Sequence, residues 1–324
     1  MNPPARPNEV FRVPNSIVQS LTTTTDPALG GETGLNRLTA FQTVTLIGLM
    51  TLLNPRRPHA EVRTTPSQVL DIIQVSRNVA HAVDRAWSTE DGATTRKTYT
   101  ARRRSPRYVT MIHEALLALH NHSVCLQRRD PKTRARLSDR VVHVLDSFGY
   151  DYHHNGKALD LHDLPQGYER INIGSEGRPV WRLRVVRDGD AQFHRPRRVC
   201  FRLNAELARE LGNQVGTIGS TLFARKIFGL FRRYMRSPAT IRLIILILRQ
   251  TGEQFCRGLT QILVDLGFDI THPRRAMGEL ASALGELKGA NLLTTYRVDQ
   301  GADRLEMQVN RLWHQVEPAR GGAS

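Results

Sequence analysis

The stretch HPRRAMGELASALGELKGANLL, residues 272–293, combines a proline near its start with apolar residues at helical spacing. Proline is typical of the first turn of a helix, because its missing N–H would be unpaired there anyway. The apolar residues predict one buried stripe, made of Ala276, Leu280, Ala283, Leu284 and Leu287. The pattern therefore predicts a helix over residues 273–288, followed by a strand that includes LLTTYRV.

An earlier part of the chain carries the same pattern. SPRYVTMIHEALLALHNHSVCL (105–126) matches the stretch above, LTAFQTVTLIGLMTLL (38–53) matches RSPATIRLIILILRQ (236–250), and SQVL (67–70) matches TQIL (260–263). Each copy is predicted to be three helices followed by a two-stranded hairpin. The first copy is longer by about 25 residues between its second and third helices, which gives a polar insertion near residues 77–104. The sequence therefore contains a repeated module.

Three helices followed by a hairpin is the plan of a winged helix, a helix-turn-helix with a β wing. We therefore predict an α+β fold with two tandem winged-helix domains. The predicted domains are a flexible N-terminal arm (1–34), a first winged-helix domain with an insertion and a β-rich extension (35–204), a second winged-helix domain (205–317) and a tail (318–324). Within the arm, the pattern of VFRVPNSIVQSL, residues 10–21, allows it to dock as a short element.

Two further elements follow from local patterns. Residues 181–186 and 199–203 alternate apolar with other residues, which predicts a β-hairpin between them. LFARKIFGLFRRYMR, residues 222–236, predicts a helix with one face toward a core, formed by Ile227, Phe228, Phe231 and Met235.

The charge of the chain favours a polyanionic partner. Its 324 residues include 46 Lys and Arg against 30 Asp and Glu, which gives a net charge of +16. Nucleic acid is the leading partner, and a membrane surface is the main rival. The two most apolar stretches, residues 38–53 and 241–248, are shorter than the ~20 residues that span a bilayer. We therefore expect no membrane association and, because residues 1–11 lack an apolar signal core, a cytoplasmic protein.

The helix over residues 273–288 is the first candidate for DNA recognition. Its predicted outward face consists of Arg274, Arg275, Gly278, Ser282 and Gly285. Small residues are poor helix formers, so local stability does not explain them. They let a helix backbone approach a surface closely, as entry into a major groove about 12 Å wide requires. The alternative is a flat helix that packs on another helix.

The helix over residues 106–121 is the second candidate. Its predicted buried stripe is Val109, Ile112, Leu116 and Leu119, and its predicted outward face is Arg107, Thr110, Met111, Glu114 and Ala118. Arg102, Arg103 and Arg104 precede its N-terminus, where backbone amides and the helix dipole favour a phosphate. We expect this helix to hold the DNA backbone rather than to recognise bases. The alternative is an ordinary solvated amphipathic helix.

Other basic residues flank these helices. The loop of the first hairpin fits a wing on the phosphate backbone, with Arg128, Arg129, Lys132, Arg134, Arg136 and Arg140. The second hairpin offers Arg297 and Arg304 against two aspartates, so we expect it to contribute less. The helix before the second module adds Arg225, Arg232 and Arg236, and its alternative is a linking helix with solvated arginines.

Enzyme sites are weakly supported. The HNH triplet at residues 120–122 falls at a helix end, whereas paired metal-binding histidines of nicking enzymes need a strand. The loosely spaced histidines of residues 153–162 favour a solvated turn, and His272, Arg275 and Tyr296 only partly match a tyrosine recombinase. Three distant cysteines argue against zinc and disulfides, and no phosphate-binding glycine motif occurs. We therefore expect no catalytic residue, no metal and no cofactor.

Several segments resemble the TrfA-type plasmid replication initiators (Rep proteins) with tandem winged helices. The resemblance lies in VWRLRVVRDG, RRVCFRLNAELARELG, FARKIFGLFRRYMRSPATIRLIILIL and ANLLTTYRV, within residues 180–298. It implies binding to repeated origin sequences (iterons), opening of an AT-rich segment, and recruitment of the host initiator and replicative helicase. It also implies dimerisation through the first winged helix, and Arg274, Arg275, Gly278 and Ser282 as the principal major-groove contacts. The chain departs from this family in its insertion and its histidine-rich middle.

The leading hypothesis is a sequence-specific binder of double-stranded origin DNA without its own catalysis. A transcriptional repressor of the same fold is the first alternative, because it needs only the same specific binding. A recombinase or nickase is the second. Direct repeats beside an AT-rich tract in the neighbouring DNA would separate an initiator from a repressor.

Overall fold

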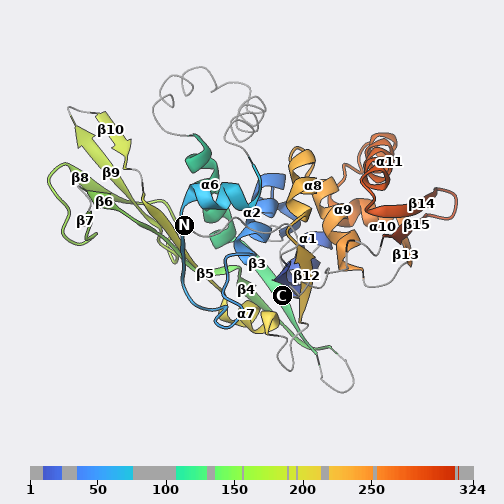
Figure 1. Cartoon of the computed structure of the whole chain (residues 1–324), viewed down its shortest axis with the longest axis horizontal. Helices are drawn as coiled ribbons and strands as arrows, with labels where there is room; N and C mark the ends of the chain where they lie inside the picture. Colours follow the sequence, from blue (N-terminus) through green and yellow to red (C-terminus); the bar gives the residue numbers. More distant parts are fainter. Residues whose placement is uncertain are drawn as a thin grey trace, which may run out of the picture. The chain divides into compact units, whose positions relative to one another are not determined.

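The computed structural model describes residues 10–23, 35–75, 107–129, 136–154, 157–187, 190–194, 196–212, 219–250, 254–310 and 313. Helices and small sheets are mixed along the chain, so the predicted α+β class is confirmed (Figure 1). The chain forms two compact units. Unit 1 contains residues 1–51, 123–142 and 209–324, and unit 2 contains residues 52–122 and 143–208. The predicted contiguous domain boundaries stay a prediction.

Helix α9, Pro238–Arg249, is the centre of unit 1. Its positions from Ala239 to Leu248 are all buried, as expected for a helix that is apolar on nearly every side. It contacts α1 (Asn15–Thr22), α2 (Ala40–Met50), α10 (Leu259–Leu266) and α11 (Pro273–Gly289). A proline at its first turn and the Ser237 hydroxyl, which accepts from the Thr240 N–H at 3.3 Å, fix where it begins.

The second copy of the repeat forms a complete winged helix. The chain runs through α9, β13 (Gln254–Gly258), α10, α11, β14 (Leu293–Asp299) and β15 (Arg304–Val309). The three strands form one antiparallel sheet in the order β13-β15-β14. The helices and the hairpin match the prediction, whereas strand β13 was not predicted because its five residues, QFCRG, lack a clear alternation.

The first copy keeps the order of elements but differs in strand pairing. It runs through α2, β2 (Val62–Thr64), α3 (Pro66–Ile72), α6 (Arg107–Asn121), β3 (Ser123–Arg129) and β4 (Arg136–His143). Strands β3 and β4 pair with each other, as predicted. Strand β2, however, joins β11 (Arg198–Leu203) and β5 (Leu145–Asp151) in a sheet of unit 2. The repeat therefore specified the helices and the hairpins of both copies, whereas the strand that follows the first helix pairs differently in each: β2 joins β11, and β13 joins β15.

Strand pairing in unit 2 also corrects the predicted hairpin between residues 181–186 and 199–203. Strand β9 (Trp181–Arg187) pairs with β10 (Asp190–Phe193) and β8 (Tyr168–Asn172), while β11 lies in the other sheet. Only two residues separate β9 from β10, and such a short connection costs less entropy to close than a longer one. A small pair, β6 (His153–His154) with β7 (Lys157–Ala158), completes the described strands of this unit.

Residues 10–22 are packed into unit 1, so the stretch that the sequence allowed to dock as a short element does so, and the boundaries of the predicted arm stay a prediction. Strand β1 (Val10–Pro14) pairs antiparallel with β12 (Ser220–Ala224), and α1 buries Ile17, Val18 and Leu21 completely. A short helical turn, η2 (Leu35–Arg37), follows. The same pairing corrects the helix predicted from residue 222: residues 220–224 are a strand, and only α8 (Ile227–Arg233) is helical.

A buried carboxyl group fixes the start of α1. Glu210, in α7 (Ala205–Leu211), accepts from the Ser16 N–H at 3.0 Å and from the Ser16 hydroxyl at 2.5 Å. These bonds satisfy a donor that the first turn of α1 would otherwise leave open. Burial raises the pKa of Glu210 from 4.5 to about 7, although the bonds from Ser16 act in the opposite direction.

No helix among the described residues is both long enough and apolar enough to span a membrane.

We predict that Glu210→Gln makes the stability of the protein less dependent on pH. Because the folded pKa is above the unfolded value, Glu210 contributes stability below pH 4.5 that is lost as the pH rises through about 7. The loss amounts to up to about 3 kcal/mol. Urea unfolding at pH 5 and pH 8 should show a larger fall for the wild type than for Glu210→Gln. Equal falls, or the same flattening in the exposed control Glu176→Gln, would contradict this role.

Candidate nucleic-acid interface

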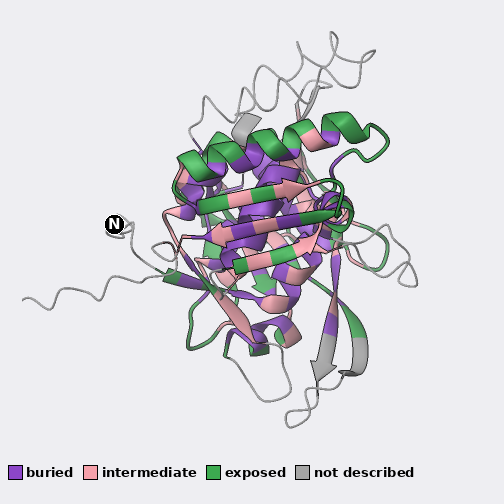
Figure 2. Ribbon diagram, turned by 90° about the vertical axis from the view of Figure 1, so that its right-hand side faces the viewer, coloured by how far each residue is buried: buried purple, intermediate pink, exposed green. Residues whose placement is uncertain are grey.

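Helix α11 presents one buried and one exposed face. Its buried residues are Ala276, Leu280, Ala283, Leu284 and Leu287, which confirms the predicted stripe. The opposite face is exposed and contains Arg274, Arg275, Gly278 and Ser282. Figure 2 shows α11 above the three-stranded sheet, with its exposed residues facing outward. The structure therefore places these four predicted DNA-binding residues together on one accessible helix face.

A buried arginine and a glycine set the turn that leads toward α11. The Arg242 guanidinium, on α9, donates from Nη1 to the Leu266 carbonyl at 2.9 Å and from Nη2 to the Leu38 carbonyl at 2.7 Å. Gly267 ends α10 with φ 74°, and a Cβ at this position would lie 2.7 Å from Nη1. Burial lowers the pKa of Arg242 to about 10, so it stays charged at neutral pH.

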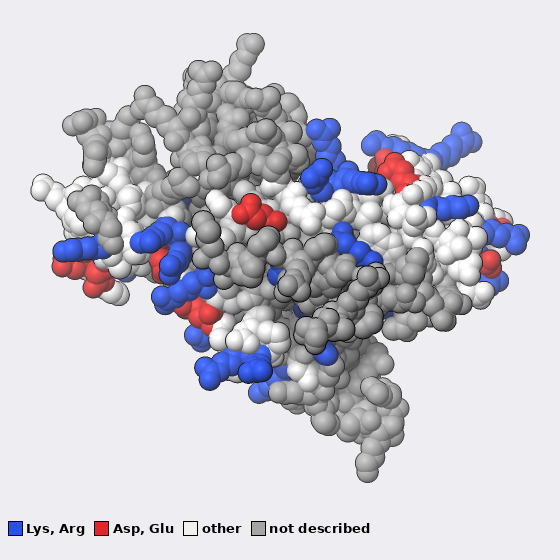
Figure 3. Space-filling view, in the orientation of Figure 1, with Lys and Arg blue, Asp and Glu red and all other residues white. Residues whose placement is uncertain are grey.

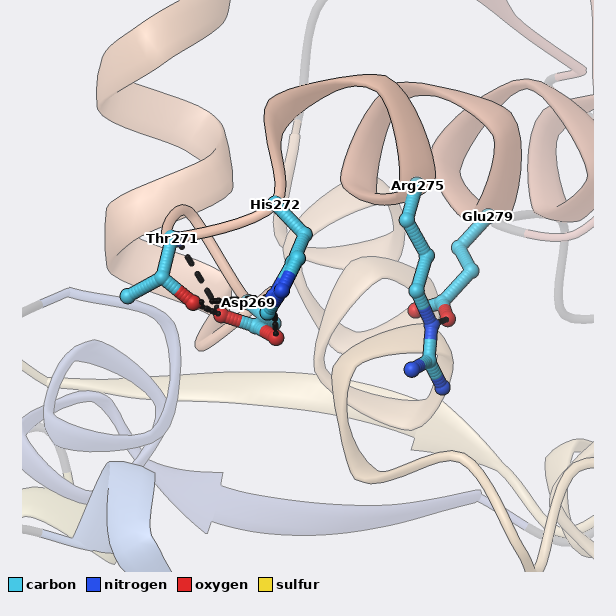
Figure 4. Close-up of polar contacts among 5 residues, drawn as sticks. All are labelled: Asp269, Thr271, His272, Arg275 and Glu279. Carbon is cyan, nitrogen blue, oxygen red and sulfur yellow. Dashed lines mark hydrogen bonds and ion pairs between the residues drawn. The ribbon is translucent and has the colours of Figure 1, made fainter.

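The residues before α11 hold one another in place (Figure 4). Asp269 accepts from the Thr271 N–H at 3.1 Å, from the Thr271 hydroxyl, and from Nδ1 of His272 at 2.9 Å. The Thr271 hydroxyl, followed by His272, holds the pKa of Asp269 down to about 2. The carboxylate is thus charged, and its hydrogen bonds hold the turn that precedes Arg274 and Arg275 of α11.

The two glycines of the predicted outward face have different surroundings. A Cβ at Gly278 would meet no atom within 4 Å, so the fold leaves this position open. A Cβ at Gly285 would lie 3.5 Å from the Tyr296 hydroxyl on β14. The helix surface at Gly278 is therefore open to a molecule that approaches from outside, whereas Gly285 lies against Tyr296 of the wing.

Arg274 and Arg275 differ in their partners although both are exposed. Nε of Arg275 donates to Glu279 Oε1 at 2.8 Å, one turn further along α11 (Figure 4). Arg274 makes no hydrogen bond or ion pair with any residue that the structure describes. The i, i+4 spacing of Arg275 and Glu279 is visible in the sequence, but the prediction did not include Glu279.

The wing of the second module is anchored and nearly neutral. Asp303 lies in the turn between β14 and β15 and accepts from the Thr260 N–H at 2.8 Å. This bond joins the wing to the start of α10. The predicted DNA contacts Arg297 and Arg304 are exposed but compensated: Arg297 lies 3.8 Å from Asp299, and Arg304 lies 3.0 Å from Glu306. Arg304 also donates to the Cys256 sulfur at 2.8 Å.

Helix α8 supplies a second basic surface to unit 1. Ile227, Phe228, Phe231 and Met235 are buried, as predicted, and Arg232 and Arg236 are exposed. Arg225 lies in the turn before α8 and is half-buried, because residues 220–224 pair with β1 instead of continuing the helix. Figure 3 shows Lys and Arg side chains gathered over the part of unit 1 where Figure 1 draws α8 and α11.

Helix α6 is more enclosed than α11. Ile112, Leu116 and Leu119 are buried as predicted, but Met111, expected on the outward face, is only 2% exposed. The reason is that α6 packs against both α3 and β5. His113 is also buried, with its ring 4.7 Å from the Tyr150 ring, and burial lowers its pKa to about 3.

The remaining predicted contacts of the first module stay predictions. Arg102, Arg103, Arg104, Lys132 and Arg134 lie outside the described residues. Arg107 and Thr110 belong to α6, Arg128 and Arg129 to β3, and Arg136 to β4, but the described side chains do not include theirs.

The enzyme-like motifs do not converge. Arg178 donates to Nδ1 of His120 at 3.0 Å, and Nδ1 of His122 bonds to the Ala118 carbonyl at 2.6 Å. Nδ1 of His153 lies 3.2 Å from Arg197, and among the described residues no group of three His, Cys, Asp or Glu is arranged for a metal ion. Tyr296 lies against Gly285, which is roughly 15 Å along α11 from Arg275. The recombinase-like set is therefore not assembled.

Comparisons with known proteins give only remote likenesses. No family model and no curated protein matches the sequence. A structure of domains 2 and 3 of RctB has a TM-score of 0.42 and 11% identity, covering 84% of this chain and 83% of that one. The Pi initiator protein in complex with iteron DNA has a TM-score of 0.46 and 10% identity, covering 94% of this chain and 99% of that one.

We predict that two glycine-to-alanine substitutions, one before α11 and one on it, change the stability of the protein in opposite directions. Gly267→Ala should destabilise the protein by at least about 1 kcal/mol, because the left-handed backbone disfavours a Cβ and Arg242 occupies its space. Gly278→Ala should raise stability by up to about 1 kcal/mol, since alanine is the better helix former and the position is open. Urea titrations of both variants measure this. Destabilisation by Gly278→Ala would mean that the α11 face is covered within the protein.

Proposed function

We propose that this chain is a replication initiator that binds repeated origin DNA sequence-specifically through its winged helices, without a catalytic step of its own. The observation that carries the proposal is the exposed face of α11, which begins with two arginines and continues with small residues. A helix of this kind fits the major groove of double-stranded DNA, about 12 Å wide, with its backbone close to the base edges.

The surroundings of α11 support the same role. Exposed Arg232 on α8 and exposed Arg236 in the turn after α8 belong to the same unit and can neutralise phosphates beside the groove. The net charge of +16 supplies a general attraction to DNA, which explains association but not sequence preference. The compensated wing arginines fit a hairpin that positions α11 more than it adds charge.

The further steps of initiation follow from the resemblance in sequence. They are opening of an AT-rich segment beside the repeats and recruitment of the host initiator and replicative helicase, with a homodimer as the form that limits replication. A transcriptional repressor with the same interface is the alternative, because the α11 face serves both roles equally.

Selection of duplexes from a random pool by the full chain tests the proposal directly. A shared motif long enough for two modules supports it, and recovery of unrelated sequences contradicts it. A supercoiled plasmid that carries the selected motif as direct repeats beside an AT-rich tract then separates the two roles. Protein-dependent opening of that tract, detected by a single-strand-specific reagent, is expected for an initiator and not for a repressor.

We predict that Arg275 on α11 and Arg236 in the turn after α8 have different effects on DNA binding. Arg275→Ala should cost about 1 to 3 kcal/mol with the selected duplex and relax base preference at one position. Arg236→Ala should weaken selected and scrambled duplexes alike and reduce the salt slope by about one. Fluorescence titrations at several salt concentrations provide the measurement. Equal, sequence-blind losses from both variants would contradict these roles.

A further inference from the structure

The ion pair between Arg275 and Glu279 stands on the exposed surface of α11. Nε of Arg275 and Oε1 of Glu279 are 2.8 Å apart, and the two side chains are 73% and 48% exposed. Neither residue belongs to the buried stripe of the helix. The pair therefore lies on the surface that the proposed function assigns to DNA.

Helix stability does not explain this pair. Arg275 lies in the first turn of α11, next to the positive end of the helix dipole, where a cation is unfavourable. The order of the pair, with the basic residue nearer the N-terminus, is the weaker of the two possible orders. An exposed pair of this kind also adds little to the stability of a protein. What the pair does determine is which donors of the guanidinium stay open.

Glu279 engages one edge of the Arg275 guanidinium and leaves the other open. The contact uses Nε, and no other polar contact of Arg275 occurs among the described residues. In Figure 4 the two terminal nitrogens of Arg275 lie at the far end of the side chain, away from its own helix. Two parallel N–H donors in that position match the O6 and N7 acceptors of one guanine in the major groove.

We propose that Glu279 is a specificity-determining positioning residue, which holds the Arg275 guanidinium end-on so that it contacts one guanine of the bound DNA. The inference rests on the proposed function and adds one base and one acidic residue to it. Because Glu279 restrains Arg275, less side-chain entropy is lost when the two contacts with guanine form.

The negative charge of Glu279 also weakens the binding of duplexes that lack the contacted guanine. A free arginine can turn to a phosphate on any sequence, whereas Arg275 must first leave Glu279 before its guanidinium can turn away from the direction in which the ion pair holds it. The carboxylate then faces the phosphates without its partner, which is repulsive. Discrimination thus comes from a penalty on other sequences as well as from a contact with the right one.

Arg274 is a matched comparison within the same turn of α11. It is exposed like Arg275 and has no hydrogen-bond or ion-pair partner among the described residues. It is therefore free to follow phosphates, and its replacement should change affinity without changing the preference for one guanine.

The first experiment locates the guanine. The duplex selected from the random pool is remade with each guanine in turn replaced by 7-deazaguanine, which lacks the N7 acceptor. Wild-type protein should lose roughly 10-fold in affinity at one guanine. Arg275→Ala should show no further loss there, whereas Arg274→Ala should keep the full loss. A uniform response of all three proteins would overturn the assignment of Arg275 to a guanine.

The second experiment tests Glu279. Glu279→Ala should lower the ratio of selected to scrambled affinity by roughly 10-fold, mainly through tighter binding of the scrambled duplex. Glu279→Gln keeps an acceptor for Nε and should retain the response to 7-deazaguanine while binding scrambled DNA more tightly. Glu176→Ala makes the same change in charge at an exposed turn outside the interface and should leave the ratio unchanged.

The double variant Arg275→Ala/Glu279→Ala shows whether Glu279 acts by positioning Arg275 or only through the effect of its own charge on DNA binding. Its affinity ratio should equal that of Arg275→Ala alone. An unchanged ratio in Glu279→Ala, with the response to 7-deazaguanine intact, would overturn the role of Glu279 but keep α11 as the DNA contact. If the wild type itself prefers no sequence, the proposed function fails instead.

Discussion

The guanidinium of Arg242 is the interaction on which the arrangement of unit 1 depends. It is the only charged group among the buried positions of α9, and two backbone carbonyls, of Leu38 and Leu266, receive its hydrogen bonds. A buried charge is costly unless such bonds satisfy it. The carbonyls belong to Leu38, two residues before α2, and to Leu266, the last residue of α10. Both helices are therefore held to α9 at fixed points, and the turn at Gly267 that leads to α11 starts from one of them.

The repeated module shows how one sequence pattern serves two surroundings. Helices α6 and α11 share a proline near the start and a buried stripe. Helix α6 contacts both α3 and β5, so Met111 and His113 are buried as well. Helix α11 contacts α9 and β14 on one side only, and its other face stays open. The helix with fewer arginines before it is thus the one better placed to enter a groove.

Local patterns predicted the elements that local interactions determine. Helix α11 was placed to within a residue, because periodicity and Pro273 both act over a few positions. The pairing of β1 with β12 joins residues more than 200 positions apart, and no local pattern indicates it. In the candidate interface, the charge of Arg274 and Arg275 and the small size of Gly278 were enough to predict these residues as DNA contacts. Glu279 was missed because an acidic residue on a DNA-binding surface contradicts the charge pattern used to find that surface.

The contact between Ser16 and Glu210 spans 194 positions of the chain, and this separation affects synthesis as well as stability. Helix α1 emerges from the ribosome early, but Glu210, β12 and α9 emerge roughly 10 to 40 seconds later at ordinary elongation rates. Until then Ile17, Val18 and Leu21, which the finished protein buries completely, lack the cover that β12 and α9 provide. Helix α1 is therefore fully covered only after α9 has been made. During translation, the N-terminal segment is an apolar surface exposed to chaperones.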